Sequence, residues 1–149
     1  MLAPGPIRIE QVADDAAAQW DAFVRNAPAA SIYHRYAWRG VIQRVFARDT
    51  FYFAAREGAR ICGVLPVTRL KSTLFGHFLI SMPYLNYGGT VGETPEIERL
   101  LVEHASDLAE DLGVRFAFAQ WLDRRAIQSH VVVTVREMDV PVLELRRCR

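Results

Sequence analysis

The sequence predicts an α/β (α+β) domain in which helices flank a mixed, largely antiparallel sheet, in the order β-α-α-β-β-β-α-β. Three observations support this fold class. Residues 51–56 and 60–70 are extended apolar runs joined by a Glu-Gly-Ala turn, which indicates a β-hairpin. Residues 94–113 carry helix start and stop signals around a continuous apolar stripe. Residues 114–119 are apolar again and are expected to return to the sheet as a strand.

The N-terminal part is expected to supply one strand and two helices. Residues 7–12 alternate apolar and polar side chains, the pattern of a short strand. Asp14 or Asp15 is expected to cap the first helix, because a carboxylate can accept from the free N–H groups at a helix start. A second helix is expected over residues 35–47. The spacing of its apolar residues predicts a buried face made of Trp38, Val41, Ile42 and Val45.

The middle of the chain is expected to continue with a third strand, a loop and the third helix. The strand is expected over residues 75–82 and the glycine-rich loop over residues 83–92. Pro66 lies inside the second hairpin strand, and it marks an edge or a bulge because it has no N–H to donate. The helix signals are a Thr94 cap, Pro95 in the first turn and Gly113 just past the end.

The composition is that of a folded domain. The chain has 149 residues, of which 51% are hydrophobic and 23% charged, so it can bury a core. Eighteen basic and seventeen acidic residues give a net charge of +1, which provides no general attraction to nucleic acid or anionic membranes. No membrane-spanning run or signal peptide is recognisable, so a cytoplasmic location is expected. Two cysteines, Cys62 and Cys148, are too few for a zinc site.

The most unusual segment is the loop after the third strand. Its hydroxyl, carboxamide and glycine positions suit ligand binding on a loop held by rigid elements. A tight turn with aromatic rings packed beneath it fits the same composition, and both interpretations remain open. A phosphate cradle is disfavoured, because carboxylates at the start of the third helix would repel a pyrophosphate. These carboxylates are Glu93, Glu96 and Glu98.

Two further residues are candidates for chemistry. His34 precedes the second helix, where it could act as a general base or as a capping, partly buried residue. Lys71 follows a strand, where it could contact an anionic group or remain a solvated turn lysine. No Ser/His/Asp set, paired carboxylates or metal motif can be recognised, so catalytic residues stay unassigned.

Five short stretches carry a family resemblance. They are Trp20-x-x-Phe23-Val24, Ser31-x-Tyr33-His34-x-x-x-Trp38, Gly63-Val64-Leu65-Pro66, Lys71-Ser72-x-Leu74-Phe75-Gly76 and Ser81-Met82-Pro83-Tyr84-x-Asn86-Tyr87-Gly88-Gly89. With these motifs the chain resembles the first domain of FemAB-type N-acyltransferases, in particular the subgroup associated with PEP-CTERM and exopolysaccharide systems. The last two stretches are fairly specific together, and the resemblance covers residues 7–119.

The resemblance implies a GNAT-like fold and transfer of an acyl or aminoacyl group to an amine. In the best-known members the donor is aminoacyl-tRNA and the acceptor is a peptidoglycan precursor. No firmly bound cofactor is expected, and acyl-CoA or aminoacyl-tRNA is the candidate donor. The expected partners are a second GNAT-like domain, a small-molecule or lipid-linked envelope precursor, and tRNA. The implied acceptor-pocket residues, with hydrogen-bonding and positioning roles, are Tyr84, Asn86, Tyr87, Gly88, Gly89, Lys71 and His34.

The chain also departs from the family pattern. Better-known members carry a glutamine where His34 stands and a lysine near the position of Val41 and Ile42. Residues 1–119 are expected to form the GNAT-like domain, and residues 120–149 a divergent tail that is compatible with two further strands. The loss of resemblance after Ala119 suggests a truncated or frame-altered product of a longer gene.

Two other functions compete with the half-enzyme interpretation. A stand-alone acyl-CoA N-acyltransferase of the GNAT type would carry a Gln/Arg-x-x-Gly-x-Gly/Ala loop running into a helix, and the sequence contains no such loop. A non-enzymatic RNA- or polysaccharide-binding module would need clustered basic and aromatic surface. The candidate basic residues for it are Arg35, Arg39, Arg44, Arg48, Arg146, Arg147 and Arg149.

Overall fold

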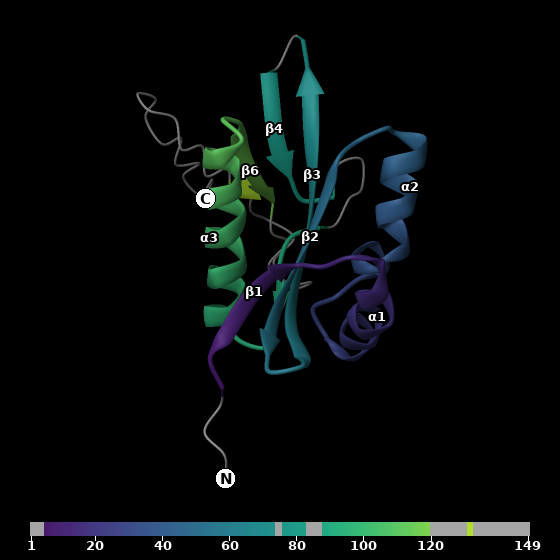
Figure 1. Cartoon of the computed structure of the whole chain (residues 1–149), viewed down its shortest axis with the longest axis vertical. Helices are drawn as coiled ribbons and strands as arrows, with labels where there is room; N and C mark the ends of the chain where they lie inside the picture. Colours follow the sequence, from purple (N-terminus) through teal and green to yellow (C-terminus); the bar gives the residue numbers. More distant parts are fainter. Residues whose placement is uncertain (1–4, 74–75, 83–87, 120–130, 133–149) are drawn as a thin grey trace, which may run out of the picture.

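The computed structural model describes residues 5–73, 76–82, 88–119 and 131–132. Within these residues one mixed sheet is flanked by helices (Figure 1). Neighbouring strands pair antiparallel except for β4 and β6, which run parallel. The spatial order is β1 (Ile7–Gln11), β2 (Thr50–Glu57), β3 (Arg60–Ser72), β4 (Gly76–Ile80), β6 (Arg115–Ala119) and β7 (Val131–Val132), and β5 (Val91–Gly92) pairs with β3.

Helices cover both faces of the sheet. In Figure 1, α1 and α2 lie on one side and α3 on the other. Two 3-10 turns, η1 (Asp14–Ala16) and η2 (Ile32–His34), precede α1 (Ala17–Asn26) and α2 (Ala37–Val45), and α3 is Pro95–Asp111. The element order confirms the predicted fold class, with the two-residue β5 as an addition. None of the described helices combines the length and the apolar character needed to span a membrane.

Alternation along β2 divides the buried residues into two cores. Phe53 and Ala55 pack toward α3, together with residues of β3 and β4. Tyr52 and Ala54 pack toward α1 and contribute to an aromatic cluster around Trp20, which is fully buried. Because successive strand residues point to opposite faces, a single strand serves both layers.

The packing of α3 follows from its capping and from one glycine of the sheet. The Thr94 side chain accepts from the Ile97 N–H at 3.3 Å, Pro95 begins the helix, and Gly113 follows it at a φ of +60°. These positions confirm the predicted start and stop signals. A Cβ atom at Gly63 would lie 2.5 Å from Cγ2 of Ile97, so the helix contacts the β3 backbone directly.

The predicted buried face of α2 is wrong in part. Ile42 is buried, but Trp38 and Val41 are half-buried, and the side chain of Val45 is 69% exposed. The helix lies beside β2, where Gln43 donates to the Thr50 hydroxyl at 2.7 Å, and its last turn extends past this contact. More apolar residues therefore have the spacing of a buried face than the described chain actually buries.

The predicted aspartate cap is also wrong. The chain enters α1 through η1, and neither helix start has a side-chain cap. Asp14 instead pairs with Arg39 and accepts from the Tyr36 hydroxyl at 3.3 Å. An ion pair to α2 has replaced the local hydrogen bond that the sequence suggested.

Pro66 lies where β3 lacks a neighbour on one side. Strand β5 pairs with Gly63 and Val64, whereas β4 pairs with β3 from Thr68 onward. Among the described residues, positions 65–67 have β2 as their partner strand. The expected edge is thus a local gap beside positions 65–67 of a central strand, among the described residues.

Candidate functional site

The candidate site lies where the chain leaves β4 and returns to β5. We call Ser81, Met82, Gly88 and Gly89, the two described ends of this excursion, the loop base. The Gly89 N–H donates to Oγ of Ser81 at 2.8 Å, and both residues are buried. A Cβ at Gly88 would lie 2.9 Å from Cβ of Met82, so the two ends are in van der Waals contact. Gly88 is half-buried, and solvent therefore reaches the loop base beside it.

Backbone conformation explains part of this sequence. Gly89 has a φ of +106°, which a residue with a side chain rarely adopts, and the crowding at Gly88 excludes a larger residue. Met82 adopts a φ of +46° although it has a side chain, and it is buried. The predicted site residues Tyr84, Asn86 and Tyr87 lie outside the described residues and remain predictions.

His34 is the predicted site residue that the structure brings to the loop base. It ends η2 and is buried, with 3% of the residue exposed. The Ser31 N–H donates to Nδ1 at 3.1 Å, and Oγ of Ser31 lies 3.0 Å from the same nitrogen. The indole N–H of Trp20 donates to the His34 carbonyl at 2.7 Å and holds this turn against α1.

These contacts determine the protonation state of the imidazole. A backbone N–H can only donate, so Nδ1 of His34 must be the acceptor nitrogen and, in the neutral ring, Nε2 carries the proton. Burial lowers the pKa of His34, and nearby backbone groups of Gly89 and Ser31 oppose this shift. Despite the nearby Gly89 backbone, Nε2 makes no hydrogen bond of normal geometry with the described chain. His34 is therefore a buried hydrogen-bond donor and is unsuited to act as a general base.

A cluster of three aromatic rings packs beside Met82 of the loop base. The ring centroids of Trp20 and Tyr52 lie 5.0 Å apart, and Tyr36 packs edge-on against both rings. The Tyr52 hydroxyl is 3.9 Å from Sδ of Met82, a weak hydrogen bond. Burial raises the pKa of Tyr52, so this phenol stays protonated at neutral pH.

Lys71 is not part of this group. It is exposed near the tip of the β3–β4 hairpin, opposite His77. Thr68 of β3 pairs with Ile80, the last residue of β4, and so lies next to the loop base. The 13-residue strand β3 continues past Thr68 and places Lys71 at the far end of the hairpin. The structure therefore groups His34 with Gly88 and Gly89 and places Lys71 elsewhere.

Acyl-CoA is a donor implied by a GNAT-like fold, and the N-terminus of α3 is a place where its pyrophosphate could bind. The Gly92 N–H donates to a Glu98 carboxylate oxygen at 3.2 Å, and the Glu93 N–H donates to the Cys62 carbonyl at 3.0 Å. The Thr94 hydroxyl accepts from the Ile97 N–H. Since these donors are already satisfied, the described residues here do not fit a pyrophosphate.

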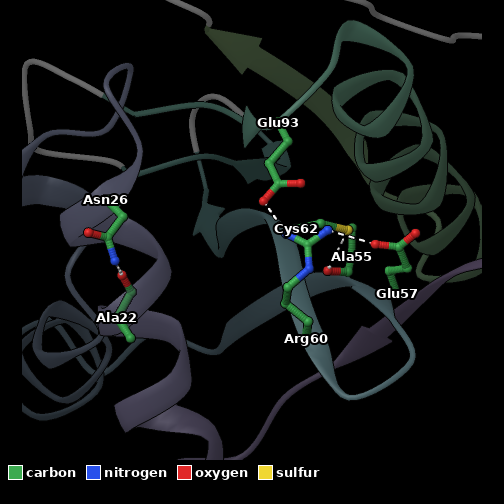
Figure 2. A network of polar contacts seen from close by, with 7 residues as sticks. All are labelled: Ala22, Asn26, Ala55, Glu57, Arg60, Cys62 and Glu93. Carbon is green, nitrogen blue, oxygen red and sulfur yellow. Dashed lines mark hydrogen bonds and ion pairs between the residues drawn. The ribbon is translucent and has the colours of Figure 1, made fainter. Parts of the chain in front are cut away.

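The arginines near this helix start are also paired. Figure 2 shows Arg60 between Glu57 and Glu93, with Nη2 of Arg60 2.6 Å from Glu57. Arg99 on α3 pairs with Glu96 and Glu103. An incoming pyrophosphate would meet carboxylates and would have to displace an existing ion pair.

A separate groove of about 370 Å³ lies along the end of β1 and η1. Its polar lining includes Glu10, Asp15 and Gln19, and Arg56 is already bonded to Glu10 and Gln19. It shares no lining residue with the loop base. Among the described residues, no group of three or more His, Cys, Asp or Glu could hold a metal ion.

Sequence reasoning missed several residues of the site. Ser81 was known only as part of a family motif, and Ser31, Trp20 and Tyr52 were assigned no role at the site. An S-x-x-H spacing before a helix is a capping signal that could have paired Ser31 with His34. The contact between His34 and the loop base joins positions 55 residues apart and has no local signal.

Comparison with solved structures identifies the fold. A GNAT family acetyltransferase from Brucella melitensis, in complex with acetyl-CoA, has a TM-score of 0.56 at 14% identity, covering 80% of this chain and 79% of its own. A GNAT family acetyltransferase from Staphylococcus aureus has a TM-score of 0.56 at 8% identity, covering 83% and 93%. A transcriptional regulator from Bacillus halodurans has a TM-score of 0.55 at 14% identity, covering 80% and 84%.

No protein-family model matches the chain, and a search of curated proteins finds no match. The chain has a GNAT-like fold, and the likeness at these identities extends to the fold alone.

Proposed function

We propose that this chain is the acceptor-binding half of a FemAB-like transferase that moves an acyl or aminoacyl group to an amine of a cell-envelope precursor. The observation that carries this proposal is the loop base, where the buried donor nitrogen of His34 lies beside the contact between Ser81 and Gly89. The GNAT-like fold supports acyl transfer as the reaction class. The described residues of the loop base and His34 offer hydrogen-bond donors and include no carboxylate, which suits recognition of amide or sugar oxygens.

The start of α3 favours the half-enzyme over a stand-alone acyl-CoA enzyme. The fold likeness fits both functions, but the Glu98 carboxylate occupies the Gly92 N–H that a phosphate would need. The proposed donor is therefore an aminoacyl ester such as aminoacyl-tRNA, bound mainly by another domain. The amine attacks the acyl carbon, a C–N bond forms, the ester C–O bond breaks, and the amine proton leaves with the released hydroxyl.

In this reaction the chain positions the acceptor. His34 cannot accept the amine proton, because Ser31 already occupies its acceptor nitrogen. Its contribution is to hold the acceptor so that the amine meets the donor in the right geometry. Proton transfer is assigned to the leaving hydroxyl, and no described residue of the loop base is assigned as a base.

The proposed partner is a second GNAT-like domain. Two apolar side chains on the α2 side, Ile32 and Val45, are 68% and 69% exposed, which supports contact with another protein surface. RNA binding by the same side is less favoured, since Arg35 and Arg39 are paired with Asp21 and Asp14.

The test is a transfer assay with this chain alone and together with the region encoded downstream. Each protein is given aminoacyl-tRNA or acetyl-CoA as donor and an amine-bearing lipid-linked envelope precursor as acceptor. Transfer that requires both regions and aminoacyl-tRNA supports the proposal. Transfer from acetyl-CoA by this chain alone would replace it with the stand-alone acyltransferase.

A further inference from the structure

The unsatisfied nitrogen of His34 is the feature of the described chain that points to a ligand. Leaving a buried donor without an acceptor destabilises the folded state, so such groups are rare in folded proteins. Here Nε2 is buried and has no hydrogen-bond partner of normal geometry, whereas Nδ1 of the same ring is fully used by Ser31. The ring is fixed in orientation, and one of its two polar atoms is left for another molecule.

We propose that Nε2–H of His34 donates to a carbonyl-type oxygen of the acceptor substrate, and so makes this residue a specificity determinant of the site. The inference rests on the proposed function and deepens it, because it names the group on the acceptor that is recognised. An amide or acetamido oxygen satisfies the donor, whereas an amine nitrogen in its cationic form cannot.

The neighbouring groups agree with this chemistry. The Ser81 hydroxyl accepts from Gly89 N–H through its oxygen and keeps its own hydrogen to donate. Thr68, opposite Ile80 where β4 ends, is buried with its hydroxyl unpaired among the described residues. The described polar groups at and beside the loop base can all donate, so a ligand that presents acceptor oxygens suits them.

The Gly89 backbone is the described part of the loop base that lies near the imidazole. Gly88 is half-buried, and Gly89 has no side chain to restrict a change of its backbone angles. A ligand oxygen can take the donor if the Gly89 backbone, which already lies near the imidazole, moves slightly aside.

The first test needs no variant. Nitrogen-15 NMR of the histidine rings in the full chain at pH 7 should show His34 neutral, with the proton on Nε2. A proton on Nδ1, or a cationic ring, would overturn the inference. So would a through-bond coupling from Nε2–H to the Gly89 carbonyl that persists unchanged when the probe below is added.

The second test uses a probe of defined chemistry. Nα-acetyl-L-lysine methylamide has a free amine and two amide oxygens, and cadaverine has amines and no oxygen. Adding the lysine probe should move the Hε2 resonance of His34 downfield, and cadaverine should leave it unchanged. Absence of any Hε2 response to the lysine probe, or an equal response to cadaverine, would overturn the inference.

Two variants isolate the donor. The glutamine amide of His34→Gln keeps an N–H donor and an oxygen that can accept from the Ser31 N–H, as in a capping box, whereas the ring of His34→Phe offers neither. We expect His34→Phe to bind the lysine probe about 3- to 10-fold more weakly than His34→Gln, the loss typical of one hydrogen bond. Equal affinity of the two variants would refute the donor role. If the transfer assay fails but the two variants still differ in affinity for the lysine probe, the proposed function is wrong and the inference about His34 stands.

Discussion

Replacing Ser81 with alanine tests the hydrogen bond that closes the loop base. The Ser81 hydroxyl accepts from the Gly89 N–H at 2.8 Å, and both residues are buried. In Ser81→Ala this buried N–H loses its acceptor. The expected loss in the free energy of unfolding is about 1–3 kcal/mol, the cost of a buried donor left unsatisfied. For a chain of this size each kcal/mol lowers Tm by about 2–4 °C.

Urea unfolding monitored by tryptophan fluorescence, to which the buried Trp20 contributes, measures this loss, and hydrogen exchange of the Gly89 amide localises it. Thr73→Ala, at an exposed position in the β3–β4 turn, is the matched control and should change stability by less than about 0.5 kcal/mol. If Ser81→Ala unfolds like the control and Gly89 keeps its protection, the described loop base is incorrect.

Three further predictions concern α3, His34 and the helix start. Gly63→Ala should destabilise the chain by about 1–3 kcal/mol in urea unfolding, because the new Cβ would lie 2.5 Å from Cγ2 of Ile97. The control Gly5→Ala has open space around it and should leave stability unchanged. Equal stabilities of the two variants would contradict the packing of α3 on β3. Burial holds the pKa of folded His34 below the ~6.5 of an unfolded histidine, so the unfolded chain binds more protons and the free energy of unfolding should fall as the pH drops below ~6.5. This pH dependence should be weaker in His34→Gln, and an unchanged slope would show that another group titrates. Glu98→Ala should cost about 0.5–1.5 kcal/mol in the same unfolding assay, because Gly92 N–H loses its acceptor and the helix start loses a charge; a stable variant would count against the self-capped helix start.

Local signals were sufficient for much of the fold. The Glu-Gly-Ala turn identified the β2–β3 hairpin, and Thr94, Pro95 and Gly113 delimited α3. Each of these features depends on residues within a few positions of one another. Turn and cap signals of this kind therefore do not depend on where in the fold the element packs.

Features set by distant contacts were not predictable in this way. Asp14 pairs with Arg39, 25 positions away, and therefore does not cap α1. Val45 has the spacing of a buried residue, but the described chain places nothing over it. The two-residue β5 exists because β3 offers an open edge opposite Gly63 and Val64.

Residue types alone marked the glycine-rich loop, His34 and Lys71 as separate candidates, and only the resemblance joined them into one site. That resemblance brought together His34, Gly88, Gly89 and Lys71, and the structure places the first three near one another. Lys71 is separated from them because β3 is long enough to carry it to the hairpin tip. The donor role of His34 followed from the Ser31 contact, which requires coordinates.

The most direct test of the central claim is a map of backbone amide shifts on titrating the chain with Nα-acetyl-L-lysine methylamide. If the loop base holds the acceptor, the largest changes fall on Ser81, Gly88 and Gly89. Changes concentrated instead along the polar groove at Glu10, Asp15 and Gln19 would place the amine elsewhere and contradict the proposed site.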